Sequence, residues 1–315
     1  MSRSEHVAVI GAGLMGHGIA QIFASGGNEV FLYDLSPEVL LGAKNKIKSN
    51  LKFLSEKGIG STEDIRPALE RIRIARNLKE AVSGARFVIE AVTEELEVKQ
   101  NLFKEIEGCC SSITVLATNT SLISITEIAA RTKGKERVVG THFWNPPYLI
   151  PLVEVVPGRD TSPEVVDYTY HLLQSVRKRP VKVKKDVPGS VGNRLQHALL
   201  REAISIVEQG IAEPEMVDEV IKSGFGLQLP VLGPLEKVDM VGLDLTFQIH
   251  DYILPHIERS SKPSPLLRQK QAAGELGFKT GKGFYEWSQE AIEECRKRLM
   301  EHLINWNREQ HEEQE

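Results

Sequence analysis

Short apolar runs alternate with segments of helical periodicity over the first 187 residues of the chain. The runs predict buried β-strands, which fall at residues 6–10, 28–34, 85–92, 113–121, 137–144 and 149–158, with a last strand and break at 179–189. The segments between them predict helices, and the first long helical region, interrupted by a charged loop, extends to about residue 76. Strands that alternate with helices in this way predict a mainly parallel sheet that is covered on both faces.

After Pro188 the apolar residues follow a helical period and no further strand is indicated. The segments with this period cover residues 190–211, 214–226, 243–257 and 263–277. We therefore expect two domains. The first is an α/β Rossmann-type doubly wound sheet, mainly parallel, at residues 1–187, and the second is an all-α C-terminal domain at residues 188–315.

The overall composition is that of an ordinary globular protein. Of 315 residues, 41% are hydrophobic and 26% are charged, and the net charge of −4 gives no general attraction to nucleic acid or to an anionic membrane. No apolar run is long enough to span a bilayer, and the first strand begins too early to leave room for a signal peptide. The cysteines Cys109, Cys110 and Cys295 have no metal-ligand spacing, so we expect no metal and a reducing, cytoplasmic setting.

A glycine-rich turn follows the first strand and opens a helix. Gly11, Gly13 and Gly16 have the GxGxxG spacing. In such a turn the first glycine allows a tight bend, the second lets a pyrophosphate approach the backbone, and the third lets the helix pack on the strand. The helix N-terminus then offers free N–H groups to the phosphates. We expect this turn, with Leu14 and Met15, to bind a dinucleotide; the alternative is a glycine turn in a protein that binds none.

Asp34 ends the second predicted strand, 23 residues after Gly11. An acid at this place can bond both hydroxyls of a ribose, and its charge repels a 2′-phosphate. The following residues supply no arginine that could pair with such a phosphate. The sequence therefore predicts NAD rather than NADP as the cofactor; the alternative is that Asp34 only caps the end of the strand.

His142 ends a predicted strand at the edge where open α/β sheets bind ligands, and Glu154 follows in the next strand. Oxidation of an alcohol needs a group that removes the hydroxyl proton, and a histidine oriented by a carboxylate suits that task. On spacing alone, a satisfied core histidine with an unrelated surface glutamate is an equal alternative. Similarly, Ser121 follows a strand and can donate to a substrate oxygen, but Ser121 or Ser124 can also simply cap a helix.

Eight motifs, taken together and in order, resemble the L-3-hydroxyacyl-CoA dehydrogenase family, which includes 3-hydroxybutyryl-CoA dehydrogenases. They are GAGLMGHGIA, VIEAVTEELEVKQNLF, ATNTSLISIT, GTHFWNPP, LVEVV, DVPGSVGNRL, GPLEKVDMVGLDL and GFKTGKGFYEW, and they extend from about residue 5 to residue 287. The resemblance implies an NAD-dependent oxidoreductase that interconverts an L-3-hydroxyacyl compound and its 3-keto form. It also implies a helical second domain that binds substrate and forms a homodimer.

The resemblance implies a role for each matched residue. His142 matches the catalytic base and Glu154 its paired carboxylate, while Ser121 and Asn193 match residues that bind and orient the substrate. Asn193 lies in the first turn of a predicted helix, where an asparagine can equally be a cap or be solvated. The remaining implied cofactor contacts are Glu94, Lys99, Asn119, Ser121, Asn145 and Lys279.

The sequence leaves the substrate open. Lys57 matches a lysine that contacts the coenzyme in acyl-CoA members. Lys44, Lys48 and Lys52 share one helix face, with Lys57 just beyond it; the alternative is a solvated basic face. We favour 3-hydroxybutyryl-CoA or a similar thioester. The segment around Pro151 is similar instead to relatives that act on small free acids, namely L-gulonate dehydrogenase of the lambda-crystallin group, carnitine dehydrogenase and a pyridine-carboxylate dehydrogenase. A non-catalytic dinucleotide-binding or structural protein is the alternative from another class.

Overall fold

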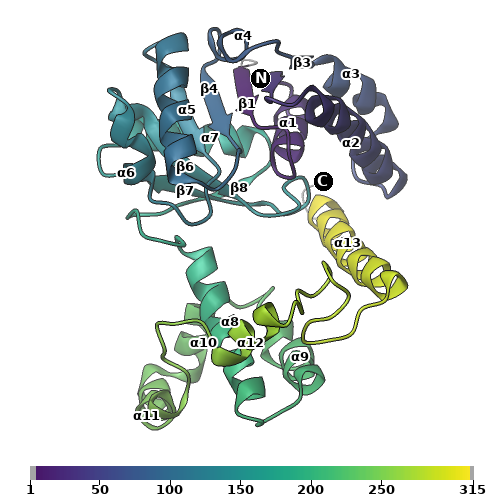
Figure 1. The fold of residues 1–315 in the computed structure, drawn as a ribbon, viewed down its shortest axis with the longest axis vertical. Helices are drawn as coiled ribbons and strands as arrows, with labels where there is room; N and C mark the ends of the chain where they lie inside the picture. Colours follow the sequence, from purple (N-terminus) through teal and green to yellow (C-terminus); the bar gives the residue numbers. More distant parts are fainter. Residues whose placement is uncertain (1–4, 313–315) are drawn as a thin grey trace. The chain divides into compact units, whose positions relative to one another are not determined.

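The computed structural model describes residues 5–312 of the chain (Figure 1). By their contacts these residues form two compact units. The first comprises the residues up to Asn193 together with those from Leu299 onward, and the second comprises Arg194–Arg298. The ranges expected from the sequence, 1–187 and 188–315, stay a prediction for the functional domains, and the structure adds that residues from Leu299 onward pack in the first unit.

The first unit is built on a sheet whose strands are ordered β3-β2-β1-β4-β5-β6-β7-β8. Neighbouring strands are parallel except β6 and β7, which are antiparallel. The strands are β1 (His6–Ile10), β2 (Glu29–Tyr33), β3 (Ile72–Ile74), β4 (Phe87–Glu90), β5 (Val115–Thr118), β6 (Val138–Phe143), β7 (Leu152–Pro157) and β8 (Arg179–Lys182). The expected mainly parallel Rossmann-type sheet is therefore confirmed.

Helices cover both faces of this sheet (Figure 1). They are α1 (Gly16–Ser25), α2 (Pro37–Glu56), α3 (Ile65–Glu70), α4 (Leu78–Val82), α5 (Leu96–Cys109), α6 (Ile125–Ile128) and α7 (Pro163–Ser175). In β1, Val7 and Val9 pack in the apolar cluster that contains α1, α2 and α7, whereas Ala8 and Ile10 pack in the cluster that contains α4, α5 and α6. Alternate residues of a strand point to opposite faces, so a strand that is buried on both sides reads as a continuous apolar run.

Strands β6 and β7 form an antiparallel hairpin that places His142 directly opposite Glu154. Residues that pair in this way have their side chains on the same face of the sheet and close together. The two ionisable groups are therefore neighbours because of the strand register, although twelve positions separate them in the chain.

One predicted element is wrong. The helical region that we expected to reach about residue 76 ends at Glu70 with α3, and Ile72–Ile74 form the edge strand β3. Its three residues read Ile-Arg-Ile, which is a strand alternation too short to be separated from a helix by sequence pattern alone. Pairing with β2 decides the outcome.

The second unit is helical. Its elements are the greater part of α8 (Gly192–Glu208), then α9 (Pro214–Ser223), α10 (Pro234–Val241), α11 (Leu243–Ile253), α12 (Pro265–Ala272) and the start of α13 (Gln289–Glu312). Helices α9, α10 and α12 begin with proline, which suits a first helical position because the missing N–H has no intrahelical partner there. The expected all-α C-terminal region is confirmed. Within the described part of the chain, no helix has the length and apolarity needed to cross a membrane.

The close approach of α1 to β1 predicts that Gly16 tolerates no side chain. A Cβ at Gly16 would lie 1.8 Å from the carbonyl oxygen of Gly11, whereas a Cβ at Gly42 in α2 would meet no atom within 4 Å. We expect Gly16→Ala to lower the free energy of unfolding by about 1–3 kcal/mol or more, because the backbone must shift. Gly42→Ala should raise it by about 0.5–1 kcal/mol, as alanine does in a helix interior. Urea unfolding measures both, and a Gly16→Ala protein as stable as the parent would contradict this account of the turn.

Candidate active site

The glycine-rich turn has the geometry that a dinucleotide requires. Gly11 has φ 97°, which favours glycine, and a Cβ there would lie 2.5 Å from the carbonyl oxygen of Ala91. Gly13 faces open space: among residues 5–312, no atom lies within 4 Å of its Cβ position, so a pyrophosphate can approach its backbone. The exposed Leu14 and the partly buried Met15 complete the turn.

The start of α1 suits an anion. No side chain caps this helix, and its first turn contains no acidic residue, so its N–H groups and partial positive charge are available to a phosphate. At the end of β2, the Asp34 carboxylate accepts hydrogen bonds from the backbone N–H of Ala12 at 2.8 Å and of Ser36 at 2.9 Å. These bonds fix Asp34 beside the turn, where an adenosine ribose of NAD would lie. The residues present therefore fit the cofactor.

The sequence reasoning missed a role for His17, which lies in the first turn of α1. The side chain is buried, and its Nδ1 lies 2.7 Å from the carbonyl oxygen of Gly13. Burial is the main cause that lowers the pKa of His17, because it disfavours the imidazolium. A neutral ring that donates from Nδ1 fixes the turn without adding charge. The position of this histidine, directly after the GxGxxG motif, was the signal that could have pointed to it.

His142 and Glu154 form a buried pair. His142 Nδ1 lies 2.8 Å from Glu154 Oε2, and the exposed fractions of the two side chains are 9% and 2%. The indole of Trp144 packs beside the imidazole, with the ring centroids 5.3 Å apart. The reading of His142 as a core histidine with an unrelated surface glutamate does not fit this geometry, because the carboxylate is buried and bonded to the ring.

Glu154 also binds the backbone at the start of α8. Its Oε1 accepts hydrogen bonds from the N–H groups of Val191 at 2.9 Å and Gly192 at 3.0 Å. Burial by itself raises the pKa of this carboxyl, but the bonds from His142 and from the two backbone N–H groups outweigh burial and lower the pKa to about 2. The carboxylate is therefore ionised at neutral pH, and His142 donates its Nδ1–H to it.

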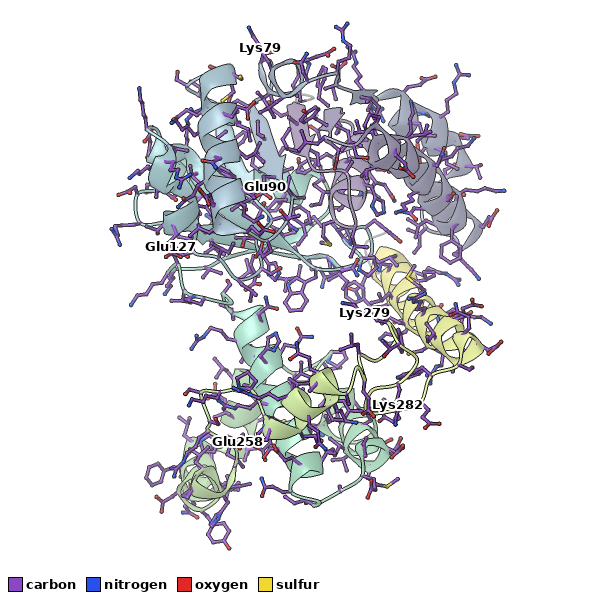
Figure 2. All side chains as sticks on the ribbon, viewed as in Figure 1. Lys79, Glu90, Glu127, Glu258, Lys279 and Lys282 are labelled. Carbon is purple, nitrogen blue, oxygen red and sulfur yellow. The ribbon has the colours of Figure 1, made fainter. Side chains whose placement is uncertain are left out.

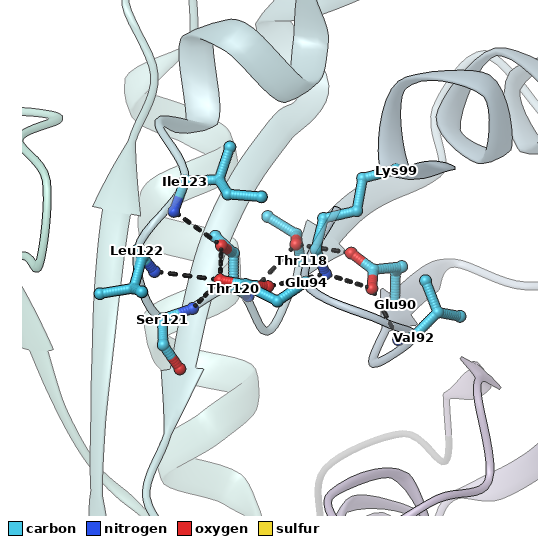
Figure 3. A network of polar contacts seen from close by, with 9 residues as sticks. All are labelled: Glu90, Val92, Glu94, Lys99, Thr118, Thr120, Ser121, Leu122 and Ile123. Atoms are coloured by element: carbon cyan, nitrogen blue, oxygen red, sulfur yellow. Dashed lines mark hydrogen bonds and ion pairs between the residues drawn. The ribbon is translucent and has the colours of Figure 1, made fainter. Parts of the chain in front are cut away.

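Ser121 lies in a loop after β5 that is held by Glu94. One carboxylate oxygen of Glu94 accepts bonds from the Thr120 hydroxyl at 2.5 Å, the Ser121 N–H at 2.8 Å and the Leu122 N–H at 3.0 Å. Figure 3 shows this network, with the Ser121 hydroxyl directed away from Glu94. The N-cap of α6 is Ser124, whose hydroxyl accepts from the Glu127 N–H, so Ser121 is not the cap.

The second carboxylate oxygen of Glu94 faces a buried ion pair. Lys99 Nζ lies 2.6 Å from Glu90 Oε1 and 3.2 Å from Glu94 Oε2, and the Lys99 side chain is only 1% exposed (Figure 3). Burial opposes ionisation of Glu94, but the Thr120 hydroxyl, the charge of Lys99 and the loop N–H groups together lower its pKa. The sequence reasoning missed Glu90, whose position at the carboxyl end of β4 was the available signal.

The three asparagines of the expected site lie in different surroundings. Asn119 Oδ1 accepts a bond from the Phe143 N–H at 2.9 Å, next to His142. Asn193 Nδ2 donates to the Ser121 carbonyl at 3.0 Å, so it ties the first turn of α8 to the Ser121 loop. Asn145 is exposed in the loop that follows β6.

Unlike the buried Lys99, the other lysines expected to meet substrate or cofactor are exposed. Lys57 ends α2, with its Nζ 5.8 Å from the centroid of the Phe53 ring. Lys44 and Lys48 line an open groove of about 550 Å³ between α2 and α3. Lys279, labelled in Figure 2, belongs to the second unit, and its expected contact with the cofactor stays a prediction. Across residues 5–312, no three His, Cys, Asp or Glu side chains are grouped so that they could hold a metal ion.

A glycine-rich turn that fits a phosphate, an acid at the end of β2 and a buried histidine–carboxylate pair are together typical of an NAD-dependent oxidoreductase. The chain matches the family models described as 3-hydroxyacyl-CoA dehydrogenase, NAD binding domain, over residues 6–187, and 3-hydroxyacyl-CoA dehydrogenase, C-terminal domain, over residues 189–287. The protein therefore belongs to the 3-hydroxyacyl-CoA dehydrogenase family. This result confirms the expected family, the NAD cofactor and the assignment as an enzyme.

Similar proteins within this family act on different substrates. The chain is 35% identical to the 5-formyl-3-hydroxy-2-methylpyridine 4-carboxylate 5-dehydrogenase of Mesorhizobium japonicum, over 91% of this chain and 92% of that protein. It is 40% identical to a probable 3-hydroxybutyryl-CoA dehydrogenase of Bacillus subtilis, over 90% of this chain and 98% of that one. A solved structure of a dehydrogenase with the first of these activities, described as an NAD+ dependent dismutase, superposes with a TM-score of 0.89 at 33% identity and covers 97% of this chain and 98% of its own.

The bonds of Glu154 predict how the stability of the protein depends on pH. Its pKa is lowered from 4.5 to about 2, so its stabilising effect is complete above pH 4.5 and is lost as the pH falls toward 2. We expect Glu154→Gln to lower the free energy of unfolding at pH 7 by about 1–3 kcal/mol, since an amide N–H then faces buried donors. The difference between parent and variant should shrink below pH 4.5.

Denaturant unfolding between pH 7 and pH 3 measures this difference. Glu105→Gln, which changes an exposed carboxylate in α5, is the matched control and should follow the parent at every pH. A Glu154→Gln protein whose stability parallels that of the control would show that the pair contributes nothing.

Proposed function

We propose that the protein interconverts an L-3-hydroxyacyl compound and its 3-keto form, with His142 as the general base. The observation that carries the proposal is the buried contact between His142 and an ionised Glu154. Because Nδ1 donates to the carboxylate, Nε2 is the ring nitrogen that can accept a proton. The carboxylate also stabilises the imidazolium that forms.

In the oxidation, His142 Nε2 takes the proton of the substrate hydroxyl while the hydrogen on the same carbon leaves as a hydride. The electron pair of the O–H bond becomes part of the new carbonyl group. Bound NAD supplies the acceptor for the hydride. Ser121 donates its hydroxyl hydrogen to the reacting oxygen, which stabilises the charge that develops there. Asn193 keeps the Ser121 loop in place through its bond to the Ser121 carbonyl.

The same proposal gives the remaining residues their roles at the cofactor. Gly11, Gly13 and Gly16 admit the pyrophosphate, and Asp34 binds the adenosine ribose. Glu94 and Asn145 contact the nicotinamide end. The burial of Lys99 and its bond to Glu94 favour an indirect role, in which Lys99 sets the position and charge of Glu94.

A 3-hydroxyacyl-CoA is the first candidate substrate, supported by the family and by the exposed Lys57, which could meet a coenzyme phosphate. A small free acid is the second candidate. It is favoured by the segment around Pro151, which is similar to relatives that act on small free acids, and by the similarity to a dehydrogenase of a pyridine carboxylate.

We also propose that the protein is a cytoplasmic homodimer. The helices of the second unit expose large apolar side chains, which suits a surface that is covered by another subunit. These include Leu195, Leu199, Met216, Val220, Leu245 and Phe247.

Replacement of the base tests the mechanism. We expect His142→Gln to reduce kcat by about 10²–10⁴-fold, the usual contribution of general base catalysis, with little change in NADH affinity. His171→Gln, at an exposed histidine of α7, should leave both unchanged. Steady-state absorbance of NADH and fluorescence titration give the two quantities, and nearly full activity in His142→Gln would refute the assignment of the base.

A turnover screen separates the candidate substrates. The purified protein with NAD is offered 3-hydroxybutyryl-CoA, free 3-hydroxybutyrate, L-gulonate and carnitine, and NADH formation is followed. We expect the highest kcat/KM for the thioester, because it alone brings phosphates that the exposed Lys57 can contact. A preference for a free acid would move the assignment to the second candidate, and no turnover of any of them would remove the proposed reaction.

A further inference from the structure

The loop of residues 145–151, here called the active-site loop, connects the strand of His142 with the strand of Glu154. Side chains from outside the loop bind three of its backbone carbonyls. Lys178 Nζ donates to the carbonyls of Pro147 and Ile150, the latter at 3.0 Å. Asn307 Nδ2 donates to the carbonyl of Leu149 at 3.0 Å.

A lysine is unusual at a buried position such as that of Lys178. It is 9% exposed, and within the part of the chain that the structure describes no carboxylate lies within ion-pair distance of its ammonium group. Burial lowers the pKa of Lys178 to about 8, because the charged amine has lost its water. A buried cation without a counter-charge contributes little to the stability of the fold. The two hydrogen bonds of Lys178 to the loop therefore indicate a role other than stability.

The second support is the end of α13, residues 299–312. Ile304 of this helix, 2% exposed, packs in one cluster with Leu54 of α2 and with Leu149 of the loop, which is 1% exposed. The guanidinium of Arg179 lies over the ring of Trp306, 5.3 Å from the ring centroid, and bonds to Gln310. Residues 299–312 lie beyond residue 287, where the match to the family model ends.

The loop also lies against α1, the helix that follows the glycine-rich turn. A Cβ at Gly18 of α1 would be 2.6 Å from Pro147 Cγ and 3.3 Å from Tyr148 Cδ1. The loop is thus in contact with α1 and is held by Lys178 and Asn307 through its carbonyls. A shift of the loop would move Pro147 relative to α1 and would move Asn145 at the same time.

We propose that Lys178 and residues 299–312 form a brace that positions the active-site loop, with Lys178 and Asn307 as positioning residues for cofactor binding. The role given to Asn145 rests on the proposed function, whereas the contacts of Lys178 and Asn307 with the loop do not depend on it. The brace acts through the loop and touches neither His142 nor Glu154. It sets where the nicotinamide end of NAD is held, and it does not set the proton affinity of the base.

Point variants test the brace. Lys178→Met and Asn307→Leu remove the donors and keep similar side-chain volumes. We expect Asn307→Leu, which removes one hydrogen bond to the loop, to raise the Kd of NADH about fivefold. Lys178→Met, which removes two, should raise it by at least as much, and kcat/KM should fall by similar factors. In a plot of log kcat/KM against pH, the pH at which the slope changes should be the same as in the parent protein. Because both residues act on one loop, the double variant should lose less than the product of the two single effects.

Fluorescence titration with NADH is the deciding measurement, because Kd does not depend on the fraction of molecules that are folded. Asn305→Leu, at an exposed position of α13, and Lys184→Met, at an exposed position after β8, are the matched controls and should keep the parent Kd. A purely structural role would lower the melting temperature or the signal amplitude in the brace variants and leave Kd and KM unchanged.

Folded Lys178→Met and Asn307→Leu proteins with a Kd within twofold of the parent would overturn the brace. A shifted pH profile would also overturn it, since the variants would then act on the His142–Glu154 pair. Failure of the proposed function gives a different result, namely full activity in His142→Gln, and NADH affinity would still report on the brace.

Discussion

The site depends on the buried carboxylate of Glu154, because each of its two oxygens accepts hydrogen bonds from a different part of the chain. One oxygen accepts the Nδ1–H of His142 and the other accepts the backbone N–H groups of Val191 and Gly192. A buried carboxylate is tolerated only when its lone pairs are satisfied, and here His142 and the start of α8 satisfy it together. The orientation of the His142 ring and the path of the chain out of the sheet are therefore fixed by one group.

The loops at the carboxyl edge of the sheet are held by the same physical means. Glu94 accepts hydrogen bonds from N–H groups of the Ser121 loop. Its other carboxylate oxygen contacts Lys99, which forms a buried ion pair with Glu90. Such backbone groups cannot be paired within a strand, because they lie where the strands end. Charged side chains satisfy them and leave the Ser121 hydroxyl free.

Much of the fold could be predicted from local pattern. The GxGxxG spacing, the acid at position 34 and the change to helical periodicity after Pro188 are each short-range signals, and together they define the sheet and the cofactor. The edge strand β3 could not be recognised, because three residues carry too little pattern and pairing with β2 decides their state. His142 could be proposed as the base from sequence. Only the strand register, which pairs His142 with Glu154, distinguishes it from an ordinary core histidine.

By itself the sequence determined the Rossmann-type class and the NAD cofactor, because these follow from periodicity and from motifs that can be read along the chain, and its resemblance to a known family supplied the candidate base. Only the tertiary structure decided which groups meet across long separations. Lys178 donates to carbonyls of the active-site loop that lie 31 and 28 positions away, and Asn307 bonds a residue 158 positions away. The physical reason is that these contacts arise from burial and from unpaired backbone groups, and no local pattern encodes either.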